Sequence, residues 1–118
     1  MCNFFSTSRD SNLLGTAFCR ALRVLDLKIE ELPSFLHDID CSQSEPLIDP
    51  KSKEGQATIL IIQIYRNLNI FSGSDESFMS HFLRTENTAF SFSKPIDLMS
   101  SIDGLEKVKS YLEKFITR

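Results

Sequence analysis

Histidine and cysteine are the residues of this chain best suited to nucleophilic or metal chemistry, and their spacing argues against both. His37 and His81 are far apart in the sequence, and neither accompanies a serine or cysteine nucleophile motif. The three cysteines, Cys2, Cys19 and Cys41, form no C-x-x-C pair, whereas a zinc site needs four ligands in closer clusters. We therefore expect surface or turn histidines, reduced thiols, no metal and no cofactor.

Carboxylates are the remaining candidates for catalysis, in the segments "LHDID" and "IEE". An acid/base pair needs burial that separates the two pKa values, whereas these acidic stretches are typical of a solvated surface. The sequence also contains no phosphate-binding glycine loop and no paired metal-ligand spacing. These patterns predict that the chain is not an enzyme.

The composition is that of one soluble domain. The 118 residues are 42% hydrophobic and 25% charged, and the net charge of -3 gives no overall positive field for phosphates or an anionic membrane. The longest apolar stretch, "ATILIIQIY", is broken by Gln63 and is far shorter than a membrane span of about 20 residues. The amino terminus lacks the basic start and apolar run of a secretory signal, so we expect a cytoplasmic protein.

Apolar periodicity predicts an all-α fold of about six to seven helices. Residues 1–11 are expected to form a flexible amino-terminal arm. The pattern then predicts a helix over 12–25, a second short helix over 29–36 with Pro33 near its start, and at most a short third helix before a linker in 38–51.

The carboxyl-terminal half continues this helical pattern. A helix is expected from about Ser52 through Asn67, although its isoleucines also suit a buried strand. Ser74 is expected to cap the next helix, Pro95 to open a short turn, and Ser101 to cap the last helix.

The region 12–51 has the spacing of a helix-turn-helix unit, whose third helix enters the major groove of DNA. Here the third element reads "DIDCSQSEPLID", with acidic residues where phosphate-binding lysines or arginines are expected, and Pro46 limits the helix to about one turn. The candidate base contacts are Ser42, Gln43 and Ser44. The acidic charge argues against DNA binding, which stays open as the alternative function.

Five short motifs follow one another along the carboxyl-terminal half. They are a Gly-Ser-acidic turn after Phe71, the Phe82-Leu83 pair, an Asn-x-Ala loop at 87–90, Pro-x-Asp-Leu at 95–98 and Gly-Leu-x-x-Val at 104–108. In this order they resemble the toxin-binding domain of the Xre/MbcA/ParS antitoxin family, which we assign to residues 52–118. The preceding region, 12–51, is similar to that family's degenerate Xre-type helix-turn-helix. The family's usual tryptophan is replaced by Phe82 here.

The resemblance implies an antitoxin of a type II toxin-antitoxin system. Such a protein binds a RES-domain toxin, which consumes NAD or transfers ADP-ribose, and neutralises it by masking the toxin's active site. A homodimer and a higher toxin-antitoxin complex are also implied, and no membrane partner is expected. The alternative is a helix-turn-helix transcriptional regulator that represses its own operon.

The partner-binding residues that we expect come from the family motifs and from the end of the chain. They are Asn87, Phe90, Phe92, Pro95, Asp97, Gly104, Lys107 and Arg118. Phe90 and Phe92 stand in an otherwise polar loop, where they either anchor an interface or fold back onto the core. Gly104 permits a close approach, either by the Pro95 turn or by the partner. Arg118 could reach a phosphate-binding pocket from the end of the last helix.

Overall fold

The chain folds into α-helices joined by short irregular segments, in a computed structural model that describes residues 8–41 and 46–116. Within these ranges there are five α-helices, three 3-10 turns and no β-strand, which confirms the all-α prediction but corrects the expected six to seven helices. The α-helices are α1 (Ser8–Leu25), α2 (Lys53–Ser72), α3 (Glu76–Leu83), α4 (Pro95–Leu98) and α5 (Ile102–Ile116). The 3-10 turns are η1 (Ile29–Glu31), η2 (Ser34–Leu36) and η3 (Thr88–Phe90).

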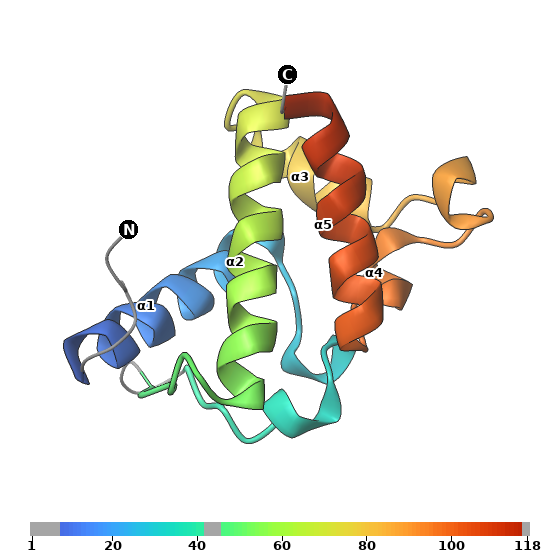
Figure 1. The fold of residues 1–118 in the computed structure, drawn as a ribbon. Coiled ribbons are helices and arrows are strands. Elements are labelled where there is room, and N and C mark those ends of the chain that lie inside the picture. Colours follow the sequence, from blue (N-terminus) through green and yellow to red (C-terminus); the bar gives the residue numbers. More distant parts are fainter. Residues whose placement is uncertain (1–7, 42–45, 117–118) are drawn as a thin grey trace.

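Helix α2 is the centre of the fold, with α5 beside it and α1 packed against it (Figure 1). The segment "ATILIIQIY" is helical throughout, and the helix continues to Ser72, five residues beyond the predicted Asn67. It begins where the Ser52 hydroxyl accepts a hydrogen bond from the Gly55 amide, at 3.0 Å. It ends at Gly73, whose φ of 68° is the left-handed conformation common after helices. No described helix is both long enough and apolar enough to cross a membrane.

Both halves of the chain contribute to one hydrophobic core. The completely buried side chains of the amino-terminal half include Phe18, Leu25 and Leu36. Those of the carboxyl-terminal half include Ile61, Ile64, Leu68, Leu83, Leu105, Val108 and Leu112. Because these residues form a single cluster, burial of their apolar surface stabilises both halves together.

The amino-terminal half differs from the helix-turn-helix prediction. The expected helix over 29–36 is wrong, because Pro33 lies between η1 and η2 and its φ of -51° and ψ of 142° interrupt any continuous helix. The described residues 38–41 and 46–52 are not helical either. Helix α1 begins at Ser8, so the last residues of the predicted arm are helical.

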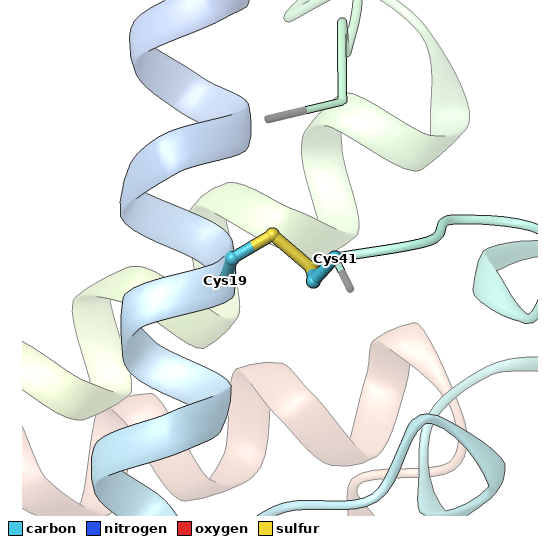
Figure 2. Close-up of a disulfide and its surroundings, with 2 residues drawn as sticks. All are labelled: Cys19 and Cys41. Atoms are coloured by element: carbon cyan, nitrogen blue, oxygen red, sulfur yellow. A yellow bond between two sulfur atoms is a disulfide. The ribbon is translucent and has the colours of Figure 1, made fainter. Parts of the chain in front are cut away.

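A disulfide joins Cys19 of α1 to Cys41, in the segment that follows η2 (Figure 2). The two Cα atoms are 5.6 Å apart although the residues are separated by 22 positions. This pair corrects the expectation of reduced thiols for Cys19 and Cys41, which sequence spacing could not anticipate because the fold brings the two residues together. Cys2 lies outside the described residues.

The Arg84 side chain connects the two halves after α3. Its guanidinium donates hydrogen bonds to the Leu25 carbonyl, at 3.3 Å, and to the Asp26 carbonyl. It also forms an ion pair with Glu31 at 3.5 Å. These carbonyls lie at the carboxyl end of α1, where a cation is favoured by the helix dipole, so Arg84 holds α3 against α1.

The helix starts of the carboxyl-terminal half follow the sequence signals, with one exception. Asp75, not Ser74, caps α3, since its carboxylate accepts a hydrogen bond from the Phe78 amide at 3.1 Å. Pro95 occupies the first turn of α4, and the Ser101 hydroxyl caps α5 by accepting from the Gly104 amide at 3.1 Å, both as predicted.

The neighbour that requires glycine at 104 is α4. A Cβ atom added to Gly104 would lie 1.6 Å from the carbonyl oxygen of Leu98 and 2.6 Å from its carbonyl carbon. Because both atoms belong to the backbone, a side chain at 104 would separate α4 from α5. Close approach inside the domain therefore explains this glycine.

Candidate partner-binding site

Six aromatic side chains form a continuous surface at one end of the helices, which we call the aromatic face. Its members come from the end of α2, from α3, from η3 and from α5, and they are Phe71, Phe78, Phe82, Phe90, Tyr111 and Phe115. The chain reverses at Gly73 between α2 and α3, which brings Phe78 back beside Phe71. Phe78 with Phe82, and Tyr111 with Phe115, are four residues apart on their helices and therefore share a face.

The rings of the aromatic face contact one another in a closed series. The Phe71 ring centroid lies 5.8 Å from that of Phe78 and 5.6 Å from that of Phe115. Phe78 continues to Phe82 at 6.3 Å, Phe82 to Tyr111 at 6.4 Å, and Tyr111 back to Phe115 at 5.1 Å. These separations are typical of attractive aromatic pairs, so the rings hold one another in place.

Much of this face is open to solvent. The exposed fractions are 42% for Phe71, 37% for Phe78 and 47% for Phe115. Contiguous exposed apolar surface is uncommon on monomeric proteins and marks sites of protein-protein contact. Aromatic residues are also enriched at the centres of such interfaces, where they supply much of the binding energy.

The loop 87–93, which carries Phe90 of this face, projects away from the helices (Figure 1). It is closed by the Asn87 amide, which donates to the Ser93 carbonyl at 3.1 Å, and by the Phe92 amide, which donates to the Asn87 carbonyl at 3.0 Å. The Asn87 side chain accepts a further hydrogen bond from the Ala89 amide at 2.9 Å. These bonds make the loop a defined turn.

The two phenylalanines of this loop have different environments. The Phe90 ring packs edge-on against Tyr111, with centroids 5.1 Å apart, and is partly buried. Phe92 is 67% exposed and has a φ of 66°, next to Ser91 at 56°. Left-handed backbone is unfavourable for a bulky residue, and residues held in it cluster at functional sites. Phe90 therefore belongs to the body of the domain, while Phe92 points to solvent.

A groove with a volume of about 550 Å³ continues from the aromatic face along α5. Its lining residues are Ala89, Phe90, Glu106, Lys107, Ser110, Tyr111 and Lys114. Phe90 and Tyr111 belong to both surfaces. The groove therefore adds two lysines and one glutamate beside the aromatic rings, an arrangement of apolar centre and charged edge that suits a protein partner.

Some predicted partner-binding residues lie on this surface and others do not. Phe90 and Lys107 line the groove, Asn87 closes the loop, and Asp97 is exposed on α4. Pro95 and Gly104 are buried inside the domain. Pro95 opens α4, and Gly104 allows α5 to pack closely against α4. Partner binding by the exposed residues stays a prediction.

Four predicted residues cannot be placed, because Arg118 and the candidate DNA contacts Ser42, Gln43 and Ser44 lie outside the described residues.

Both histidines are exposed, and a His37 ring nitrogen is hydrogen-bonded to the Leu32 carbonyl at 2.9 Å. In the part of the chain that the structure describes, no group of three or more His, Cys, Asp or Glu side chains is placed to hold a metal ion.

The sequence interpretation missed the exposed members of the aromatic face. Phe71, Phe78 and Phe115 have apolar helical spacing, which predicts burial, so none of them was expected to bind a partner. The available signal was the concentration of aromatic residues at the ends of three elements, because side chains at helix ends are covered by fewer neighbours.

The carboxyl-terminal part of the chain, which carries this surface, matches a known protein family. Residues 68–115 match the family model described as the antitoxin Xre/MbcA/ParS C-terminal toxin-binding domain. The match confirms the resemblance over these residues, and it indicates an antitoxin of a toxin-antitoxin system. A comparison with curated proteins found no match. The whole aromatic face and the loop 87–93 lie inside the matched segment.

Proposed function

We propose, from the similarity of residues 68–115 to an antitoxin's toxin-binding domain, that this chain neutralises a RES-domain toxin by covering the toxin's active site. The observation that carries the proposal is the exposed aromatic face inside the matched segment. A toxin-binding domain implies a partner protein, and this face is the apolar surface best suited to receive one.

The mode of inhibition follows from the chemistry of the surface. An inhibitor that blocks an NAD-handling cleft needs shape and apolar contact, and no reactive group. Phe92, held out by the closed loop, is suited to enter such a cleft, while the aromatic face packs against the surrounding surface. Lys107 and Lys114 then lie at the edge of the contact, where charges guide association more than they add affinity.

The remaining elements of the proposal are the cellular location and the assembly. We place the antitoxin in the cytoplasm with its toxin, and the proposed assembly includes a homodimer within a higher toxin-antitoxin complex.

The alternative, a DNA-binding regulator, has less structural support, because the described amino-terminal residues provide two short 3-10 turns in place of the bracing helix of a helix-turn-helix.

Co-purification tests the proposed function. A RES-domain chain encoded beside this one, expressed with it, is expected to co-purify as a stable complex. NAD consumption by the isolated toxin is expected to stop when this chain is added in stoichiometric amounts. Active toxin that neither binds nor is inhibited, together with tight, salt-sensitive binding of this chain to its own promoter, would instead favour the regulator.

Phe92→Gly is expected to weaken toxin binding at least about tenfold without destabilising the fold. The substitution removes the exposed ring, and glycine adopts a φ of 66° without a steric cost. We expect the free energy of unfolding to change by less than about 1 kcal/mol, because two effects oppose each other. Glycine relieves backbone strain in the folded state, which stabilises the protein, but it also makes the unfolded chain more flexible, which destabilises the protein. Calorimetric titration with toxin and denaturant unfolding measure the two effects.

Ser91→Gly is the matched control for this experiment. Ser91 has a similar φ of 56° in the same loop but no aromatic side chain, so its substitution should leave toxin affinity unchanged. An equal loss of affinity in both variants would show that loop conformation matters and that the Phe92 ring does not.

A further inference from the structure

The Cys19–Cys41 disulfide connects a helix to a segment that has little regular structure. Cys19 lies on α1 with 9% of its surface exposed, whereas Cys41 is partly exposed and follows η2. The described residues on either side of it, 37–40 and 46–52, form no helix. One sulfur is therefore held on a helix and the other on a segment whose described residues have no helical structure (Figure 2).

We propose that Cys19 and Cys41 form a reversible redox clip, which exchanges with a low-molecular-weight thiol such as glutathione. A glutathione thiolate attacks the more exposed Cys41 sulfur, forms a mixed disulfide there and releases the Cys19 sulfur as a thiolate, which takes up a proton. A second glutathione then attacks the mixed disulfide. The products are two cysteine thiols and one glutathione disulfide, and the same steps in reverse close the clip.

The core does not depend on this bond, so the fold is expected to survive its reduction. Leu14 and Phe18 of α1 are buried in the common core, with 1% and 0% of their surfaces exposed. In the described part of the Cys41 segment, the buried Ile48, the partly buried Ile39 and the Ile39 amide bond to the Leu36 carbonyl at 3.0 Å contact the body of the domain, but no helix reinforces them. Reduction should therefore loosen this segment first.

The clip and the aromatic face are built from different residues. The segment that carries Cys41 leads to the start of α2, whereas Phe71 lies in the last turn of that helix. A helix of 20 residues is about 30 Å long. Neither cysteine belongs to the aromatic face, so the clip is expected to act on the stability and mobility of the amino-terminal half.

Equilibration in glutathione buffers tests the clip. The 118-residue chain carrying Cys2→Ser, in which the two cysteines of the clip remain, is incubated over a range of reduced-to-oxidised glutathione ratios. Free thiols are then alkylated and counted by mass spectrometry. We expect a reversible transition between no labelled cysteine and two labelled cysteines, while far-ultraviolet circular dichroism stays helical.

The accompanying structural changes are measured on the same samples. Reduction is expected to lower the melting temperature by about 10 °C, in line with the loss of a cross-link between distant residues. Amide exchange at Ile39 should accelerate at least about tenfold. A protein that carries both Cys2→Ser and Cys19→Ser cannot form the disulfide. Its melting temperature should equal that of the reduced Cys2→Ser protein at every glutathione ratio.

Two results would overturn the proposal. One is a folded protein that remains unlabelled in excess reduced glutathione, which would identify a permanent structural disulfide. The other is a folded protein whose two cysteines stay labelled in excess oxidised glutathione, which would show that the pair does not close in solution.

Discussion

Gly104→Ala is expected to lower the free energy of unfolding by about 3 kcal/mol or more. The added Cβ would lie 1.6 Å from the Leu98 carbonyl oxygen, so α4 and α5 would have to move apart. A helix with glycine at an interior position is usually less stable than one with alanine there, by up to about 1 kcal/mol. Helix propensity alone therefore predicts that Gly104→Ala would raise the free energy of unfolding. Denaturant unfolding followed by circular dichroism measures the difference.

Gly73→Ala provides the matched control for this substitution. Gly73 has a φ of 68°, and a Cβ added to it would meet no atom within 4 Å. The expected cost is therefore only that of placing alanine in left-handed backbone, about 1–2 kcal/mol. A Gly104→Ala protein as stable as the parent would contradict the close packing of α4 on α5.

Phe78→Asp is expected to weaken toxin binding at least about thirtyfold, the loss typical of a central interface residue. The charge would have to be desolvated among Phe71 and Phe82, whose rings contact Phe78. The fold should persist, because Phe78 is 37% exposed and follows the Asp75 cap, where the helix dipole favours an acidic residue. Calorimetric titration gives the affinity, and circular dichroism confirms the helical content.

Leu13→Asp controls for the introduction of a charge at an exposed apolar position. Leu13 is 55% exposed and also lies near the start of a helix, α1, but outside the aromatic face. Its substitution should leave toxin affinity within about twofold of the parent, since surface changes outside an interface have small effects. Equal losses in the two variants would contradict the assignment of binding to the aromatic face.

Sequence periodicity predicted those helices whose start signals and apolar positions agree. Ser101 caps α5 as predicted, the apolar side chains of Leu105, Val108 and Leu112 in that helix are buried, and α2 is helical despite its isoleucines. The segment 29–36 has apolar residues at helical spacing, but Pro33 divides it into two 3-10 turns, because a proline shifts the preceding backbone away from helical conformation. Cys19 and Cys41 pair only because the fold brings their Cα atoms within 5.6 Å.

The loop 87–93 was predictable as a candidate site because two aromatic residues interrupt a polar stretch. The different roles of Phe90 and Phe92 were not predictable, since they depend on Tyr111, a residue of another helix, and on the φ of 66° at Phe92. Phe71 and Phe115 have apolar helical spacing that predicts burial. Their exposure follows from their positions at helix ends, which no other element of the described residues covers.

Amide hydrogen exchange of the free chain and of its complex with the RES-domain toxin tests the proposed interface most directly. Binding is expected to slow exchange in the loop 87–93 and in the ends of α2 and α5 that carry Phe71 and Phe115, and to leave α1 unchanged. Protection confined to α1, η1 and η2, with none in the loop or in α5, would contradict the account.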